Sequence, residues 1–300
     1  MEFKALALSE ALGCILGHNV AGPDGRRALR KGRPLSEGDL EVLRGLGRET
    51  IHVARLEAGD VEENTAAGRI ASALAGEGLR LSRPATGRVN LHGERLGLLR
   101  LDLDRLRQLN ELFGVTLATL EANTPVPPGK MAATLKIIPY ALPETVVHEA
   151  EILARSGGPL VRIHELSATR TGLILTGSDG SEEKVVAGFR RSLGPRLAAL
   201  GSTIESVEFV TVEDDAAEER LAATLGKVLS QGVDLVILAG ETAIMDRHDL
   251  APRALEAVGG EVELFGAPVD PGNLLLIGYR GRAAVVGAPG CARSPKVNIV

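Results

Sequence analysis

Beyond residue 170 the chain alternates short aliphatic or β-branched runs with longer segments of helical period. The short runs predict strands at residues 172–176, 204–212, 235–238 and 261–265, followed by an adjacent pair at 274–277 and 283–286. Strands separated by helices are typical of a parallel sheet that helices cover. We therefore predict a three-layer α/β/α domain with a mostly parallel sheet at residues 166–300.

The segments between these runs carry helix start and stop signals. A Ser-Glu-Glu opening precedes apolar residues at helical spacing over residues 181–200, and Pro195 predicts a kink or a break within that helix. Asp214 and Asp215 are candidate N-caps for a second helix, which runs toward Gly232. A third helix is expected near residues 250–258.

The first 165 residues lack this alternation, and glycine and proline interrupt them often. We expect one or two small mixed α+β domains at residues 1–165, with a subdomain boundary near residue 80 and a linker at residues 156–159. Residues 124–131 predict a stiff turn. The expected strands lie at residues 51–53, 87–91, 98–101, 115–120 and 131–138, and the expected helices at 38–46, 62–75 and 102–113.

Composition argues against a nucleic-acid partner. The chain has a net charge of −5 and no long run of lysine and arginine, so it lacks the positive field that a nucleic-acid-binding protein uses. Aromatic residues make up only 2% of the chain and tryptophan is absent, which removes the stacking platforms of single-strand and RNA readers. We expect no nucleic-acid partner.

The N-terminal stretch, the apolar segments and the two cysteines predict the cellular location. Glu2, Ser9 and Glu10 interrupt the N-terminal stretch where a signal peptide needs an apolar run, and no segment reaches the ~20 apolar residues of a membrane span. Cys14 and Cys291 show no metal-ligand spacing, which favours free thiols in a reducing compartment. We expect a cytoplasmic protein that does not bind a membrane.

Polar, glycine-rich loops follow four of the predicted strands. They lie at residues 176–180 (TGSDG), 240–249 (GETAIMDRHD), 269–273 (VDPGN) and 287–290 (GAPG). Ligands of an open parallel sheet bind beyond the carboxyl ends of its strands, so we expect these loops to meet at one edge. Glycine lets backbone amides approach an anion, and a helix N-terminus attracts one, which favours a phosphorylated ligand. Such loops also arise for purely steric reasons, so that explanation stays open.

Asp246 and Asp249 have three roles open to them: holding Mg²⁺, orienting a nucleophile, or capping the helix that begins near residue 250. Capping is the stronger explanation for Asp249 alone. The same loop also supplies Glu241, Thr242 and Arg247 to one edge of the sheet, and this surplus of polar side chains favours a ligand site.

Two further residues of these loops carry weaker signals. His248 has no second ligand fixed beside it by the sequence, so we leave it outside the catalytic set. Cys291 follows Pro289 and Gly290 in a loop that could hold a low-pKa thiol, but no histidine is fixed nearby. A small packed residue is the favoured interpretation of Cys291.

The order of these motifs resembles the molybdopterin-binding domain of molybdenum cofactor biosynthesis proteins, which include molybdopterin adenylyltransferases and molybdenum insertases. The resemblance rests on G-E-T at 240–242, R-H-D at 247–249 with Pro252, V-D-P-G-N at 269–273 and G-A-P-G at 287–290. LSEALGCILGHNV at 8–20 is similar to the opening of insertases. Residues 29–47, 59–67 and 128–143 resemble a subgroup that is often fused to a nucleotidyltransferase-like domain.

The resemblance implies a set of ligands and roles. Molybdopterin would place its phosphate against the loop amides, and the enzymes of this family use ATP and Mg²⁺ for adenylyl transfer or insert molybdenum. The implied catalytic residues are Asp246 and Asp249, and the implied Mg²⁺ ligands are Asp179, Asp246 and Asp249. The implied ligand-binding residues are Thr176, Gly177, Ser178, Gly240, Glu241, Thr242, Arg247, Pro271, Gly272, Asn273, Pro289, Gly290 and Cys291. The implied partners are a nucleotidyltransferase or a molybdoenzyme apoprotein, and a second copy in a homo-oligomer.

The chain also departs from the family pattern. Ala239 and Thr242 stand where the adenylyltransferase loop G-G-T-G has glycines, and Asn273 stands where the insertase loop P-G-K-P has its lysine. Pterin binding tolerates these changes more easily than catalysis does. Three hypotheses therefore stay open: a biosynthetic enzyme, a non-catalytic molybdopterin carrier, and an unrelated α/β nucleotide-binding protein.

Overall fold

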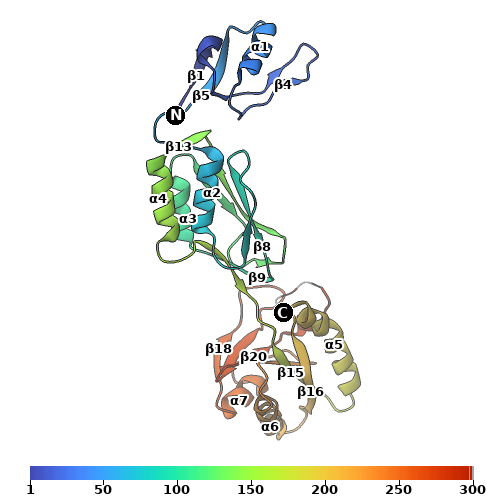
Figure 1. The fold of residues 1–300 in the computed structure, drawn as a ribbon. Coiled ribbons are helices and arrows are strands. Elements are labelled where there is room, and N and C mark those ends of the chain that lie inside the picture. The colour runs from blue at the N-terminus through green and yellow to red at the C-terminus, as the bar shows by residue number, and fades with distance from the viewer. Residues whose placement is uncertain (297, 299–300) are drawn as a thin grey trace. The chain divides into compact units, whose positions relative to one another are not determined.

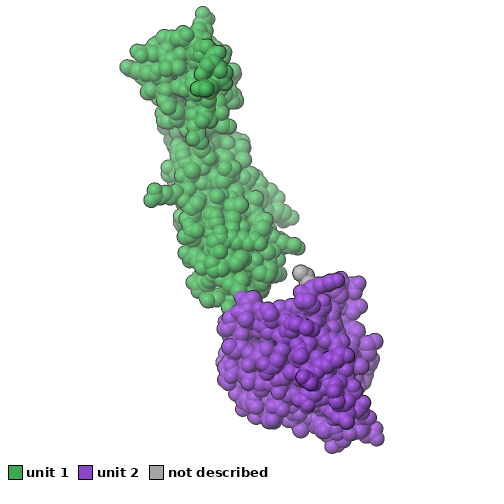
Figure 2. Space-filling view, turned by 90° about the vertical axis from the view of Figure 1, so that its right-hand side faces the viewer, with its two compact units in different colours: residues 1–166 green, residues 167–300 purple. Residues whose placement is uncertain are grey.

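The computed structural model describes residues 1–296 and residue 298. It divides the chain into two compact units, Met1–Leu166 and Ser167–Val300, which Figure 2 shows in green and purple. Both units mix helices with strands, so the predicted α/β class is confirmed. In the described part of the chain, no helix combines the length and the apolarity that crossing a bilayer requires.

The first part of unit 1 is a small sheet with one helix. Its three-stranded sheet has the order β1-β5-β2, and a second pair of strands forms the β3–β4 hairpin. Ser36 begins the helix α1 with a capping box: its hydroxyl accepts a hydrogen bond from the Asp39 amide at 3.2 Å, and its own amide donates to Asp39 at 2.9 Å. Leu40 and Leu43 then pack into the core beneath. The elements are β1 (Glu2–Ala7), η1 (Leu8–Glu10), β2 (Ile15–Leu16), β3 (Val20–Ala21), β4 (Arg27–Leu29), α1 (Glu37–Gly45) and β5 (Thr50–Arg55).

The rest of unit 1 packs three helices against antiparallel strands. Its sheets have the orders β10-β12-β8-β7, β11-β9-β14 and β13-β6, and one core cluster runs from residue 66 to residue 163. Leu74 and Leu91, on either side of the predicted subdomain boundary near residue 80, belong to this one cluster. The elements are β6 (Asp60–Glu62), α2 (Glu63–Leu74), β7 (Leu79–Leu81), β8 (Arg88–Gly93), β9 (Gly97–Leu101), α3 (Leu103–Glu111), β10 (Val115–Thr119), β11 (Pro125–Val126), β12 (Met131–Ile137), β13 (Ala141–Pro143), α4 (Glu144–Arg155) and β14 (Val161–Glu165).

Residues 156–159 are not the linker between the two units. They join α4 to β14 inside unit 1, and β14 pairs antiparallel with β9. The carbonyl oxygen of Gly158 accepts a hydrogen bond from Arg105 at 2.8 Å. The linker prediction is therefore wrong, because this glycine pair ends a helix rather than separating two compact units.

Unit 2 is built on one six-stranded sheet with the order β16-β15-β17-β20-β19-β18. The pairs β15–β16, β15–β17 and β17–β20 are parallel, while β19 is antiparallel to both of its neighbours. The elements are β15 (Arg170–Gly177), α5 (Glu182–Ala199), β16 (Thr203–Thr211), α6 (Ala217–Ser230), β17 (Leu235–Gly240), α7 (Leu250–Ala257), β18 (Glu261–Phe265), β19 (Leu276–Arg280), β20 (Ala283–Gly287) and η2 (Gly290–Arg293).

The strand β15 shows how apolar residues fill both sides of this sheet. Leu173 and Leu175 share a core cluster with Phe189 of α5, whereas Ile174 points the other way and shares a cluster with Leu225 of α6. Successive strand residues point to opposite faces, so an unbroken aliphatic run requires cover on both. Helix α5 therefore lies on one face, and α6 and α7 lie on the other (Figure 1).

The structure contradicts a break at Pro195 and an aspartate N-cap for α6, while a kink at Pro195 stays a prediction. Helix α5 continues through Pro195 without a break. Pro195 and Arg191 are both exposed, so water can reach the Arg191 carbonyl that loses its helical partner. Helix α6 has Ala216 rather than an aspartate at its N-cap. Asp214 lies two residues further back, where its side chain accepts a hydrogen bond from the Ala216 amide at 3.0 Å.

Candidate functional site

Strand direction brings the four predicted loops to one edge of the sheet in unit 2. Strands β15, β16, β17 and β20 run in the same direction, and β18 joins them because two antiparallel pairings separate it from β20. The register pairs Thr176 of β15 with Gly240 of β17, and Leu238 of β17 with Gly287 of β20. The loops that follow β15, β17 and β20 therefore begin side by side, and the loop after β18 leaves from the same edge of the sheet.

From the neighbouring strands β15 and β17 the chain continues in opposite directions across the sheet. From β15 it moves outward through α5 to the edge strand β16, then returns through α6 past β15 to β17. Helix α5, which follows β15, lies on one face, and α7, which follows β17, lies on the other. The loop after β15 and the loop after β17 therefore leave toward opposite faces. Such a topological switch point opens the crevice in which doubly wound sheets bind their ligands.

Glu241 and Ser178 meet across this switch point. The Glu241 Oε2 atom accepts a hydrogen bond from the Ser178 amide at 2.9 Å and another from the Ser178 hydroxyl at 2.8 Å. The Glu241 amide donates to the Thr176 carbonyl at 3.0 Å. The hydrogen bonds from the amide and hydroxyl of Ser178 lower the pKa of the Glu241 carboxyl. The Glu241 carboxylate thus occupies both hydrogen-bond donors of Ser178.

The glycines that end the strands have a steric explanation. A Cβ on Gly240 would lie 2.1 Å from Thr176 Oγ1, and one on Gly177 would lie 2.5 Å from Ser181 Oγ. A Cβ on Gly287 would lie 2.4 Å from the Ile244 Cδ1 atom. Each glycine therefore makes room for a neighbouring side chain, which is the alternative explanation that the sequence left open.

The acidic loop residues are held mainly by their own backbone. Asp249 is the N-cap of α7, with Oδ1 accepting from the Leu250 amide at 2.7 Å and Oδ2 from the Met245 amide at 3.0 Å. Asp246 accepts a hydrogen bond from the His248 amide at 2.8 Å, and its Oδ1 atom lies 3.0 Å from His248 Nδ1. These two contacts with His248 lower the pKa of the Asp246 carboxyl. Capping is therefore an observed role of Asp249.

The predicted metal ligands do not gather into a cluster. The Asp179 amide donates to Glu213 at 3.0 Å, and the Asp179 side chain is exposed. Within residues 1–296 and 298, no three histidine, cysteine, aspartate or glutamate residues are grouped closely enough to hold a metal ion. The Mg²⁺ roles of Asp179, Asp246 and Asp249 stay predictions.

The remaining predicted ligand residues lie along the same edge. Thr242, Arg247, Pro271, Asn273 and Gly290 are exposed, whereas Gly272 and Pro289 are buried and Cys291 is half-buried in η2. The amide of Ala288 donates to the Leu238 carbonyl at 2.7 Å and fixes the start of the last loop against β17. Contact of these residues with a ligand stays a prediction.

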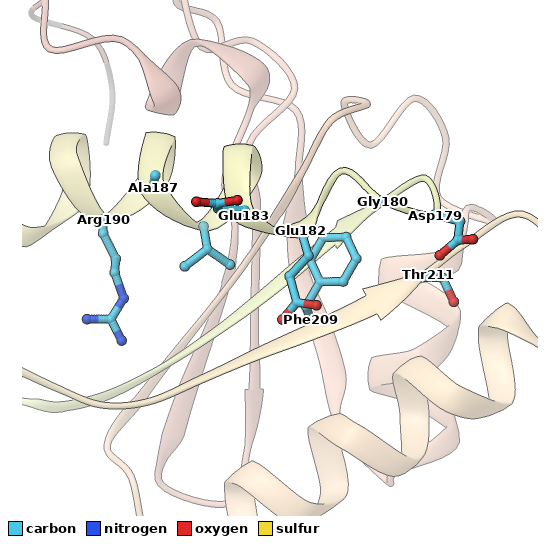
Figure 3. A pocket seen from close by; sticks show the side chains of 9 residues that line it. Asp179, Gly180, Glu182, Glu183, Ala187, Arg190, Phe209 and Thr211 are labelled. Carbon is cyan, nitrogen blue, oxygen red and sulfur yellow. The ribbon is translucent and has the colours of Figure 1, made fainter.

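A pocket of 730 Å³ lies beside the first loop, between α5 and β16 (Figure 3). Of the predicted site residues, only Asp179 lines it, and the sequence analysis missed Arg190 and Phe209 on its walls. The spacing of residues along the helix and along the strand could have indicated both. Arg190 follows Glu183 at the i+7 position of one helix face, and Phe209 alternates with Thr211 along β16.

Comparisons with known proteins give little further guidance. A family model described as a domain of unknown function (DUF8806) matches residues 5–55. No curated protein matches the chain.

Several solved structures match at low similarity. A molybdenum cofactor biosynthesis protein from Pyrococcus furiosus is 14% identical with a TM-score of 0.24, and the match covers 97% of this chain but only 59% of that one. Two molybdopterin biosynthesis MoeA structures from Pyrococcus horikoshii are 13% and 10% identical, with TM-scores of 0.30 and 0.23. Those matches cover 96% and 97% of this chain and 70% of each MoeA chain. TM-scores this low do not establish a shared fold.

Proposed function

We propose that this protein binds molybdopterin and acts in molybdenum cofactor biosynthesis, with the pterin phosphate held at the crevice between the ends of β15 and β17. One observation carries this proposal: the G-E-T loop of the motif series and the loop after the first strand adjoin at the topological switch point, where Glu241 contacts Ser178. The loops whose motifs resemble the molybdopterin-binding family thus lie where a sheet of this topology binds its ligands.

Backbone dipoles favour a phosphate at this place, although the Glu241 carboxylate would have to leave the Ser178 donors for it. The loop at residues 178–181 leads into α5, an 18-residue helix whose N-terminal amides attract anions. Arg247, in the second loop, is exposed and forms no ion pair with any residue that the structure describes. ATP and Mg²⁺ belong to the same proposal if the protein is an enzyme. Its residues would then act by positioning and electrostatic stabilisation, and phosphoryl chemistry of this kind requires no protein nucleophile.

A non-catalytic carrier is the second candidate. Asn273 replaces the lysine of the insertase loop, which removes a cation that could meet phosphate or molybdate. Among the described residues, no three histidine, cysteine, aspartate or glutamate side chains are grouped closely enough to hold a metal ion. A carrier would hold the pterin at the same crevice and pass it to a nucleotidyltransferase or to a molybdoenzyme apoprotein. Self-association and a cytoplasmic location complete this proposal.

One incubation separates the candidates. The protein is mixed with molybdopterin, ATP and Mg²⁺, and both pyrophosphate release and bound pterin are measured. Turnover supports the adenylyltransferase, while tight pterin binding without turnover supports the carrier. Binding of neither pterin nor nucleotide would contradict both and leave an α/β protein of unrelated purpose.

A further inference from the structure

Two arginine side chains of unit 1 form a basic pair outside the candidate site described above. Arg100 of β9 and Arg162 of β14 stand directly opposite each other in the antiparallel pair. Residues directly opposite in such a pair project from the same face, with Cβ atoms about 5 Å apart. Two like charges in this arrangement repel each other, so the pair is unfavourable unless something neutralises it.

Neither arginine has an acidic partner in the part of the chain that the structure describes. Arg100 donates one hydrogen bond at 2.7 Å, to the neutral side-chain oxygen of Asn123. Arg162 takes part in none of the ion pairs or side-chain hydrogen bonds formed by the described residues. It also borders a second pocket that Glu77 and Glu165 line, yet it forms an ion pair with neither carboxylate. Both guanidinium groups are therefore available to an outside anion.

The two side chains line one pocket of 400 Å³, together with Asp102 and the loop at residues 157–159. A third arginine, Arg105, is fixed at its wall: it pairs with Asp102 at 2.9 Å and donates to the Gly158 carbonyl at 2.8 Å. Asp102 neutralises Arg105, so the charges of Arg100 and Arg162 remain uncompensated. This concentration of positive charge occurs in a chain whose net charge is −5.

We propose that Arg100 and Arg162 form a binding site for the phosphate group of a small molecule. Planar guanidinium groups bind phosphate through paired, charge-assisted hydrogen bonds. The pocket lies within the range of about 300–1,000 Å³ typical of small-molecule sites, so it has room for a small organic group beside the phosphate. The acidic net charge and the scarcity of aromatic residues argue against a nucleic-acid backbone as the source of that phosphate. This site is independent of the molybdopterin proposal.

The test compares the wild-type chain of residues 1–300 with Arg162→Gln and with a matched control, Arg80→Gln. Arg80 is also an exposed strand arginine of unit 1, and it lies outside the pocket. Calorimetric titrations use inorganic phosphate and glycerol 3-phosphate, each at constant ionic strength. Losing a charge-assisted pair should weaken phosphate affinity about ten- to hundredfold in Arg162→Gln and leave the control close to wild type. Arg162→Lys keeps the positive charge but loses the paired donors of the guanidinium group, so its phosphate affinity should lie between those of Arg162→Gln and the control.

Thermal unfolding adds a second measurement, the melting temperatures of Arg162→Gln and wild type without and with phosphate. Without phosphate, Arg162→Gln should melt no lower than wild type, because the repulsion with Arg100 is gone. With phosphate, wild type should gain more than the variant, since only ligand bound to the native state raises stability. Tighter binding of glycerol 3-phosphate than of inorganic phosphate would identify an ester as the preferred source. Equal phosphate affinity in wild type and Arg162→Gln, no phosphate binding by wild type, or equal stabilisation by sodium chloride would overturn the proposal.

Discussion

Replacing Gly240 by alanine tests whether the glycine at the switch point is required for packing. The added Cβ would lie 2.1 Å from Thr176 Oγ1 and 2.9 Å from the Thr176 carbonyl oxygen. The carbonyl belongs to the backbone of the neighbouring strand, so rotation of a side chain relieves only the first contact. Overpacking of this kind costs about 1–3 kcal/mol. For a domain of this size, that corresponds to a fall in the melting temperature of about 3–15 °C.

The assay is scanning calorimetry of the full chain, with hydrogen exchange used to assign the affected transition to β15 and β17. Thr176→Ala combined with Gly240→Ala removes the hydroxyl contact, so the double variant should recover part of the loss. Gly290→Ala is the control, because an added Cβ there meets nothing within 4 Å. If Gly240→Ala proves as stable as Gly290→Ala, the steric explanation of this glycine is refuted.

Three other predictions concern single side chains. Asp249→Ala should lower the stability of unit 2 by about 1 kcal/mol in thermal unfolding, and Asp249→Asn by less, because asparagine also caps helices; abolished turnover in both variants would indicate a metal role. Glu241→Gln should increase molybdopterin affinity at pH 7 in a binding titration. The lowered pKa keeps the wild-type Glu241 carboxylate ionised on the Ser178 donors, where its negative charge repels the phosphate. Weaker binding by the variant would show that the carboxylate assists the ligand. Ser36 and Arg33 lower the pKa of Asp39 to about 2, so its stabilisation is present above the ordinary aspartate pKa and disappears as the pH falls through about 2. Asp39→Asn should remove this acid-dependent part, about 2 kcal/mol in urea unfolding between pH 5 and 2, and an unchanged slope would contradict it.

The sequence could predict the sheet of unit 2 because its strands are aliphatic runs bounded by glycine and polar loops. Each of the six strands overlaps a predicted run. In unit 1 the same reasoning missed strands of two or three residues, such as β2 and β11, which are too short to show a period. It also missed the longer strands β1 and β14, which pair with distant segments. It also missed α4, whose buried positions are Val147, Ala150 and Ala154, because small residues give little contrast between the two faces.

The position of the candidate loops at one edge of the sheet could be predicted from the sequence, but the contacts between them could not. Strand order brings the loops to one edge, and motif order could indicate that edge. Contacts between side chains of different loops, such as Glu241 with Ser178, depend on tertiary geometry that no local pattern encodes. The opposed pair Arg100 and Arg162 was missed for the same reason, since their register follows from strand pairing over 62 residues of sequence.

Hydrogen exchange of the full chain with and without molybdopterin tests the central proposal most directly. Ligand bound at the switch point should slow exchange in the loops at residues 178–181 and 241–249, which flank the Glu241 and Ser178 contact. The Gly157–Gly158 loop of unit 1 should be unaffected. Binding of molybdopterin without protection of these two loops, or no binding at all, would contradict the proposed site.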